Sequence, residues 1–182
     1  MGAQPPVCNF GWKAPAFDLP GTDGKRHRLA DAAGPNGLLV MFICNHCPYV
    51  KAIRTHIIRD SVDLQALGIG VVAISANDPA DYPEDSFENM QRVAREFKFP
   101  FPYLFDESQE VARAYDAVCT PDFFGFNSGL ELQYRGRLDA SRTAPVPDAR
   151  RDLFEAMKTV AQTGKGPADQ IASIGCSIKW KR

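Results

Sequence analysis

The stretch that decides the fold is "MFICNHCPYV", residues 41–50, in which two cysteines stand two residues apart directly after an apolar run. Residues 37–43, "GLLVMFI", are almost wholly apolar, as in a strand that is covered on both faces of a sheet. From about Asn45 to Ala66, small and apolar residues recur at helical spacing. These residues are Val50, Ile53, Ile57, Ser61 and Leu64. The stretch therefore predicts a strand, a turn that carries Cys44 and Cys47, and a helix.

The flanking sequence continues this alternation of strands and helices. Asp23-Gly24 separates two short extended runs within residues 17–29, which predicts an N-terminal β-hairpin. Further on, we expect strands at 70–75 and 102–105, helices at 87–97, 108–115 and 148–162, and a second hairpin that turns at 127–129. Ser86 is expected to cap the helix that follows it. Parallel strands followed by an antiparallel hairpin predict an α/β fold with a central mixed sheet and helices on both faces.

The size and composition favour one domain over residues 1–182, with an N-terminal arm (1–13) and a C-terminal tail (164–182). The 21 basic residues nearly balance the 22 acidic ones, so no overall charge attracts nucleic acid or an anionic membrane. No apolar run approaches the roughly 18 residues of a membrane span, and the first residues lack a secretory pattern. We therefore expect a cytoplasmic protein without nucleic-acid or membrane partners, and the sequence leaves its oligomeric state open. Since there is no glycine-rich phosphate loop, no organic cofactor is expected.

The cysteines indicate chemistry rather than a structural framework. The chain has an odd number of them, spread unevenly: Cys8, Cys44, Cys47, Cys119 and Cys176. Structural disulfides are rare in a reducing compartment, where closely spaced cysteines are more often catalytic, redox-sensing or metal-binding. Attention therefore falls on the pair Cys44 and Cys47.

The expected position of the pair favours a reactive thiolate. Cys44 would follow a central strand at its carboxyl end, where open α/β sheets carry their chemistry. A helix that begins there offers free N–H groups, and such cysteines have pKa values of about 3.5 to 7.5 instead of about 8.5. His46 could stabilise the anion further by donating a hydrogen bond. We expect Cys44 to be the ionised nucleophile and Cys47, one turn into the helix, to be the buried resolving thiol.

These motifs carry a resemblance to known proteins. A strand followed by C-x-x-C-P and a helix, with a later Thr-Pro before a hairpin, resembles the thioredoxin fold. Residues 12–31, "WKAPAFDLPGTDGKRHRLAD", and 38–50, "LLVMFICNHCPYV", are similar to the alkyl hydroperoxide reductase and thiol-specific antioxidant (AhpC/TSA) branch of that superfamily. Further segments are similar to a group of cytosolic thioredoxin-family proteins: "CNHCPYVKA" (44–52), "VCTPDFFGF" (118–126), "YRGRLDASR" (134–142) and "IGCSIKWK" (174–181).

The resemblance implies roles for two further residues. Pro121 would have a cis peptide bond and lie against the two cysteines. The backbone of Thr120 would be open for strand-like pairing with an extended substrate. Because extended residues alternate faces, Cys119 should point away from the pair. The candidate catalytic residues are therefore Cys44, Cys47, His46, Thr120 and Pro121.

The sequence departs from both branches of the superfamily. Thioredoxins carry a buried acid six residues before the first cysteine, but Leu38 stands there, so His46, water or an acid elsewhere must take the proton. Against the peroxiredoxin pattern P-x-x-x-[ST]-x-x-C, Cys44 occupies the Ser/Thr position and Cys47 that of the peroxidatic cysteine. Val40 replaces the proline, and Arg142 is a candidate for the arginine that polarises a peroxide.

Three functions remain open. The favoured one is a thiol-disulfide oxidoreductase that acts on protein or small-molecule disulfides through Cys44 and Cys47. The second is a thiol-dependent peroxidase, in which a sulfenic acid condenses with the other cysteine. The third is a metal-binding or redox-sensing module, with Cys44, His46 and Cys47 joined by Cys119 or Cys176. Alternatively, the pair is merely buried in the core and His46 is a solvated loop residue.

Other candidates have simpler interpretations. His27 and His56 are expected to be structural, and Arg142 fits a surface or ion-pair position. Cys8 is expected to be inert. Cys176 has the same expectation, although "GCSIKWK" could allow it to reach the site as a further resolving thiol.

Overall fold

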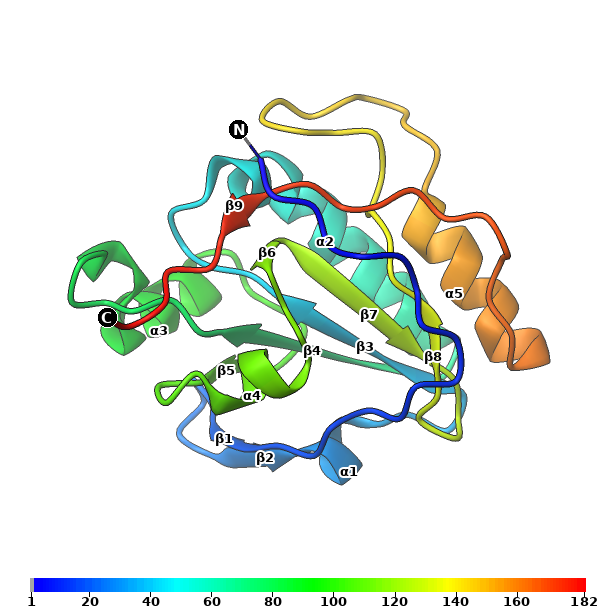
Figure 1. Cartoon of the computed structure of the whole chain (residues 1–182), viewed down its shortest axis with the longest axis horizontal. Helices are drawn as coiled ribbons and strands as arrows, with labels where there is room; N and C mark the ends of the chain where they lie inside the picture. Colours follow the sequence, from blue (N-terminus) through cyan, green and yellow to red (C-terminus); the bar gives the residue numbers. More distant parts are fainter. Residues whose placement is uncertain (1) are drawn as a thin grey trace.

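A five-stranded mixed sheet forms the centre of the computed structural model, which describes residues 2–182 (Figure 1). The strand order is β5-β4-β3-β7-β8. Their bounds are β3 (Gly37–Phe42), β4 (Ile69–Ser75), β5 (Tyr103–Phe105), β7 (Asp122–Phe126) and β8 (Leu132–Tyr134). β3 pairs parallel to β4 and antiparallel to β7, which confirms the predicted mixed sheet.

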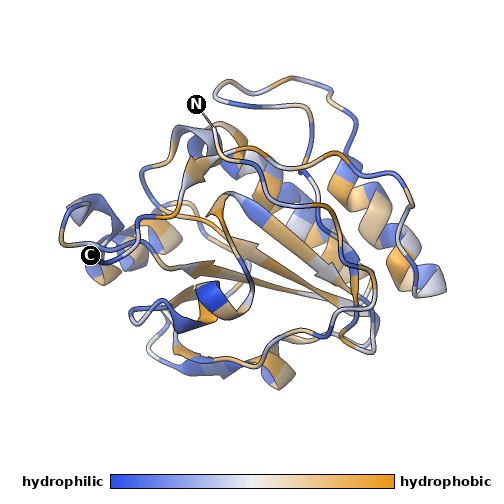
Figure 2. Ribbon diagram, in the orientation of Figure 1, coloured by the Kyte–Doolittle hydropathy of each residue, from blue (hydrophilic) through white to orange (hydrophobic). Residues whose placement is uncertain are grey.

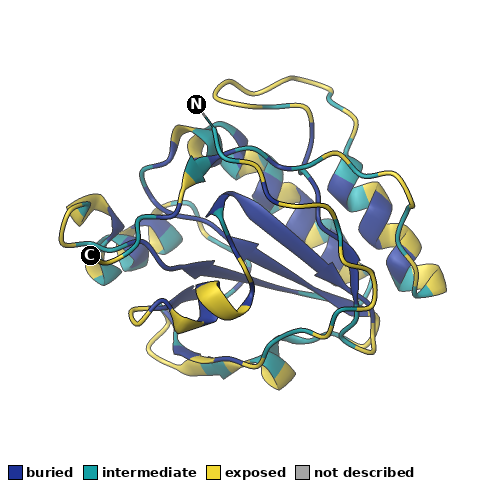
Figure 3. Ribbon diagram, in the orientation of Figure 1, coloured by how far each residue is buried: buried dark blue, intermediate teal, exposed yellow. Residues whose placement is uncertain are grey.

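Alternate residues of β3 point into two cores, one on each face of the sheet. Leu39 and Met41 pack in one core with residues of α2 (Pro48–Ala66), α3 (Phe87–Glu96) and α5 (Asp152–Thr163). Leu38 and Val40 pack in the other with residues of α4 (Glu110–Ala114) and the N-terminal segment that contains α1 (Leu29–Ala32). The sheet is apolar in Figure 2 and almost wholly buried in Figure 3. Leu38, which replaces an acid of the thioredoxins, is thus an ordinary core residue.

Two small sheets complete the fold. β1 (Asp18–Pro20) and β2 (Arg26–Arg28) form the predicted N-terminal hairpin. β6 (Cys119–Thr120) pairs antiparallel with β9 (Cys176–Ser177), which lies in the C-terminal tail. The sequence does not predict this second pair, because two-residue strands carry no periodic pattern. Among the described residues, no helix is both long enough and apolar enough to cross a membrane.

The helix after the cysteine pair begins later than predicted. α2 starts at Pro48, and Cys47 is its N-cap with an extended backbone (φ −64°, ψ 124°). The cause is local, since a residue that precedes proline is sterically kept out of the helical region. The buried face of α2 includes Val50, Ile53 and Ile57, as expected. Cys47, and not Cys44, therefore lies at the helix start.

Ser86 caps α3 as predicted, directly after the short 3₁₀ helix η1 (Pro83–Asp85). Its Oγ accepts a hydrogen bond from the backbone N–H of Asn89 at 3.2 Å. We expect Ser86→Ala to lower the free energy of unfolding by about 1 kcal/mol, because the N–H of Asn89 loses its partner. Urea denaturation measures this change. Ser128→Ala, in an exposed turn, serves as the control, and equal unfolding free energies for the two variants would contradict the role of the cap.

Candidate active site

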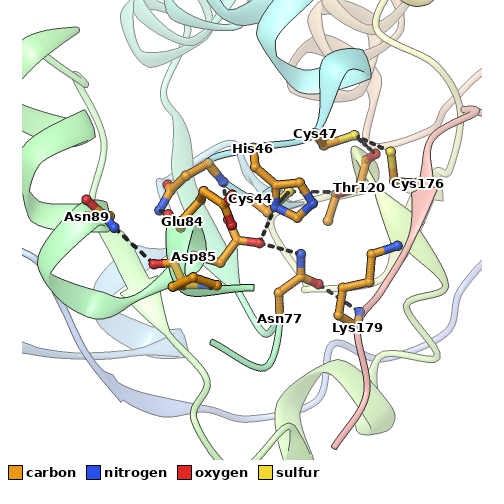
Figure 4. A network of polar contacts seen from close by, with 12 residues as sticks. Cys44, His46, Cys47, Asn77, Glu84, Asp85, Asn89, Thr120, Cys176 and Lys179 are labelled. Atoms are coloured by element: carbon orange, nitrogen blue, oxygen red, sulfur yellow. Dashed lines mark hydrogen bonds and ion pairs between the residues drawn. The ribbon is translucent and has the colours of Figure 1, made fainter. Parts of the chain in front are cut away.

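Three thiols meet at the carboxyl edge of β3 (Figure 4). Cys44 follows β3 closely, and its Sγ lies 3.4 Å from Oγ1 of Thr120. Cys47 Sγ contacts the backbone oxygen of Thr120 at 3.2 Å. On its other side, Cys47 Sγ lies 2.9 Å from Sγ of Cys176, which β9 brings to the site. All three cysteines are free thiols in the structure.

The three sulfurs differ in exposure. Cys44 is 3% exposed and Cys47 is fully buried. Cys176 is only half-buried. Of these three, Cys176 is therefore the sulfur that solvent reaches most easily.

The pKa values of the paired cysteines shift in opposite directions, which favours a thiolate on Cys47. Hydrogen bonding from the thiols of Cys44 and Cys176 and from the backbone N–H of Val50 lowers the pKa of Cys47 to about 4, although burial opposes this. The pKa of Cys44 is raised well above its ordinary value, first by its hydrogen bond to Cys47, then by burial and by the carboxylate of Asp85. The sequence predicts the charge on Cys44, whereas these pKa shifts favour Cys47, first because of the hydrogen bond between the two thiols.

His46 is held in place by a buried carboxylate. Its Nδ1 lies 2.5 Å from Oδ2 of Asp85 and 4.0 Å from Sγ of Cys44. Asp85 is fully buried, and it also accepts hydrogen bonds from the backbone of Asn45 (2.8 Å) and the side chain of Asn77 (2.9 Å). The imidazole of His46 stacks on Tyr82 at 5.3 Å between ring centroids. His46 is therefore an ordered member of the site and not a freely solvated histidine.

Asp85 is a site residue that the sequence analysis missed. It is a buried acid beside the cysteines, whereas Leu38 stands at the position where thioredoxins carry one. Its segment, "NDPADYPED" (77–85), is rich in turn-forming residues, and nothing in its spacing shows that η1 folds back onto His46. The missing acid at position 38 was the available signal, since it calls for an acid from elsewhere in the chain to accept a proton from the cysteine pair.

Thr120 and Pro121 stand where the resemblance placed them, and the Thr120-Pro121 peptide bond is cis. The expectation that the Thr120 backbone is open to a substrate is wrong, because Thr120 pairs with Cys176 of β9. Cys119 is buried, and its Sγ contacts the backbone oxygen of Pro121 at 3.4 Å. Burial raises the pKa of Cys119 strongly, so it stays protonated and outside the group of three thiols.

One group within residues 2–182 could hold a metal ion. Ligand atoms of Cys44, His46 and Asp85 lie within 4.8 Å of one another. The set proposed from the sequence is different, since it included Cys47 with Cys119 or Cys176. The structure brings Cys47 and Cys176 together as a sulfur pair and leaves them outside the metal-ligand group.

The remaining candidates lie away from the sulfurs. His56 pairs with Asp139 at 2.7 Å, and His27 pairs with Asp23 at 2.9 Å, in keeping with structural roles. Arg142 lines a small pocket beside Pro121. Burial raises the pKa of Cys8 to about 11, and Cys8 packs against the core on the opposite face of the sheet from Cys44 and Cys47.

The charge assignment predicts a titration. Near neutral pH, the reduced protein should contain one thiolate, on Cys47, and this thiolate should gain a proton only as the pH falls towards about 4. The ultraviolet absorbance of thiolates measures this transition. Cys47→Ser should remove it, whereas Cys119→Ser should leave it unchanged, because Cys119 is protonated. A transition that survives in Cys47→Ser and disappears in Cys44→Ser would show that the charge is on Cys44.

The order of the sheet, the cysteine pair at the start of α2 and the cis proline beside it define a thioredoxin-like protein. The model of the AhpC/TSA family matches residues 10–138, and the chain belongs to this family.

Known proteins support this assignment. The Mycobacterium tuberculosis protein named "Putative peroxiredoxin Rv2521" is 27% identical over 154 residues, which cover 79% of this chain and 93% of that protein. The crystal structure of a conserved protein from Geobacillus kaustophilus has a TM-score of 0.92 and 44% identity, and the match covers 100% of this chain and 97% of that one. The thioredoxin domain of the thiol-disulfide oxidoreductase BVU-2223 from Bacteroides vulgatus shares the fold, with a TM-score of 0.64, 17% identity and coverage of 84% and 97%.

Proposed function

We propose that the protein is a thiol-disulfide oxidoreductase whose redox pair is Cys44 and Cys47. The observation that carries the proposal is that the sulfurs of Cys44 and Cys47 both contact Thr120, at 3.4 and 3.2 Å, beside the cis proline, with pKa shifts that favour a thiolate on Cys47 next to a thiol. A thiolate is the attacking species in disulfide exchange, and a neighbouring thiol completes the reaction. The proposed substrates are disulfides of proteins or small molecules.

The electrostatics favour a definite order of events. The Cys47 thiolate attacks one sulfur of the substrate disulfide, forming a mixed disulfide and releasing the first substrate thiol. Cys44 then loses its proton and attacks Sγ of Cys47, which forms the Cys44–Cys47 disulfide and releases the second thiol. This order reverses the one expected from the sequence, and the lowered pKa of Cys47 supports it. Nδ1 of His46 lies 4.0 Å from Sγ of Cys44 and is hydrogen-bonded to Asp85, and we assign these two acid-base side chains to the transfer of the proton of Cys44.

A peroxidase is the second candidate. The family and the relative named as a peroxiredoxin favour it, and so does the lowered pKa of Cys47, which occupies the position of the peroxidatic cysteine. In this reaction, Cys47 attacks the peroxide and becomes a sulfenic acid while water or an alcohol leaves. Cys44 then condenses with the sulfenic acid, and a second water leaves as the disulfide forms.

One experiment separates these functions. The reduced protein is mixed either with hydrogen peroxide or with oxidised glutathione, and formation of the Cys44–Cys47 disulfide is followed by quenched alkylation and mass spectrometry. Faster reaction with the disulfide supports exchange, and faster stoichiometric consumption of peroxide supports the peroxidase. Native mass spectrometry of the untreated protein tests the third candidate, because a bound metal ion would add its mass. If neither oxidant joins Cys44 to Cys47, both redox proposals are wrong.

A further inference from the structure

Cys47 has a second sulfur neighbour that the proposed exchange does not use. Its Sγ lies 2.9 Å from Sγ of Cys176, although the two residues are 129 positions apart in the sequence. Since a disulfide needs a separation of about 2.05 Å, the sulfurs must move by less than about 1 Å to bond. Building on the proposed function, we propose that Cys176 is a second resolving cysteine, which forms a Cys47–Cys176 disulfide in alternation with Cys44–Cys47.

β9 positions Cys176 through its backbone. Cys176 pairs with Thr120, and Ser177 pairs with Cys119, so the tail runs antiparallel to the strand that precedes Pro121. On the other side of the tail, Ala3 and Gly175 exchange backbone hydrogen bonds of 2.7 and 3.1 Å. These contacts fix the backbone on both sides of the thiol. The position of Cys176 beside Cys47 is therefore set by the backbone pairing of the tail.

Gly175 makes this close approach possible. A Cβ atom at this position would lie 2.0 Å from the backbone oxygen of Thr120 and 2.5 Å from its carbonyl carbon. Both atoms belong to the backbone and cannot rotate away as a flexible side chain would. A larger residue would therefore push β9 off Thr120 and separate Cys176 from Cys47.

The exposure of the sulfurs indicates what a second resolving thiol contributes. Cys44 and Cys47 are buried, whereas Cys176 is half-buried on the tail. In a Cys47–Cys176 disulfide, one of the two bonded sulfurs would be that of the half-buried Cys176, which an external dithiol can attack. Cys176 thus connects the buried pair with its reductant.

The steps balance without a further reagent. Burial and then the contact with Cys47 raise the pKa of Cys176 to about 11 in the reduced protein. In the mixed disulfide the charge of Cys47 is gone, and Cys176 loses its proton as it attacks Sγ of Cys47. The Cys47–Cys176 bond forms, and the substrate thiolate leaves and takes up that proton. Alternatively, Cys176 attacks the Cys44–Cys47 disulfide. In that case the Cys44–Cys47 bond breaks, and Cys44 leaves as a thiolate and takes up the proton. An external dithiol then returns two electrons to the Cys47–Cys176 disulfide.

The test is disulfide mapping after brief treatment with oxidised glutathione, followed by acid quench, alkylation and mass spectrometry. The wild type should yield both Cys44–Cys47 and Cys47–Cys176. Cys44→Ser should yield Cys47–Cys176, and Cys176→Ser should yield only Cys44–Cys47. Cys119→Ser is the matched control and should give the wild-type pattern, since this buried thiol contacts neither partner.

Two failures have different meanings. If Cys44→Ser accumulates Cys47 bound to glutathione and forms no bond to Cys176, the role of Cys176 is wrong, while Cys44–Cys47 in the wild type still supports the proposed function. If no variant forms a Cys44–Cys47 disulfide and Cys47 does not bind glutathione, the proposed function itself is wrong.

A second variant tests position without changing a sulfur. In the Cys44→Ser background, Gly175→Ala should slow formation of the Cys47–Cys176 disulfide on the order of 10²-fold, as expected when reacting atoms are displaced by about 1 Å. Gly129→Ala is the control, because a Cβ there would meet its nearest atoms at 3.4 Å. An unchanged rate in Gly175→Ala would overturn the proposal that β9 positions Cys176.

Discussion

Cys47→Ser should reduce the rate of disulfide exchange on the order of 10³-fold or more, because the serine hydroxyl cannot replace the thiolate as nucleophile. In the proposed mechanism Cys47 is the thiolate, in keeping with its lowered pKa, and its sulfur lies 2.9 Å from that of Cys176. The measurement is reduction of a protein disulfide with an excess of dithiol, corrected for the rate of the dithiol alone. Cys119→Ser should keep the wild-type rate.

A trapping experiment shows which sulfur attacks first. In a Cys44→Ser, Cys176→Ser double variant, both resolving thiols are absent, so substrate should accumulate as a mixed disulfide on Cys47. Cys47→Ser should trap substrate on Cys44 only slowly, because the thiol of Cys44 is protonated. Fast trapping on Cys44 would instead support the order expected from the sequence, with Cys44 as the nucleophile.

Asp85→Asn should lower the exchange rate about 100-fold, the lower end of the range for loss of a proton-transfer group. Asparagine cannot hold Nδ1 of His46 as the carboxylate does, and its amide group would face the amide of Asn77. A second effect of Asp85→Asn, on the pKa of Cys44, should partly offset this loss of rate, because Cys44 becomes easier to ionise. The carboxylate of Asp85 helps to raise the pKa of Cys44, after the hydrogen bond to Cys47 and burial, so its removal should lower that pKa.

The pH dependence distinguishes a positioning role from a purely structural one. Alkylation of Cys44 as a function of pH should show its titration at lower pH in Asp85→Asn than in the wild type. Asp139→Asn is a matched control, because Asp139 is also buried and bonded to a histidine, His56. Asp139→Asn should lower the stability of the fold to a similar degree, while the pKa of Cys44 should stay at its wild-type value. If Asp85→Asn keeps the wild-type rate and titration, Asp85 only supports the fold.

Local patterns were sufficient to predict most of the fold. A nearly continuous apolar run identified β3, apolar residues at helical spacing identified the buried face of α2, and Asp23-Gly24 identified the first hairpin. Capping preference identified the start of α3 at Ser86. The C-x-x-C spacing and the Thr-Pro pair brought Cys44, Cys47, Thr120 and Pro121 into one site, as the contacts among them show.

The sequence analysis missed features that depend on contacts between distant segments. Asp85 reaches His46 only because η1 folds against the end of β3, and β9 pairs with β6 across more than fifty residues of sequence. The late start of α2 could have been predicted, since the restriction that Pro48 places on Cys47 is local. Applying it would have placed Cys47, and not Cys44, at the N-cap of the helix.

The backbone pairing of Ala3 with Gly175 also affects how the recombinant protein should be prepared. Residue 175 immediately precedes Cys176, so the N-terminal segment at Ala3 lies beside β9, and a tag fused to this segment would be close to the sulfurs of the candidate site (Figure 1). Such a tag could loosen the tail or supply foreign metal-binding histidines close to the sulfurs. Measurements of reduction potential and metal content should therefore be made on protein from which an N-terminal tag has been removed.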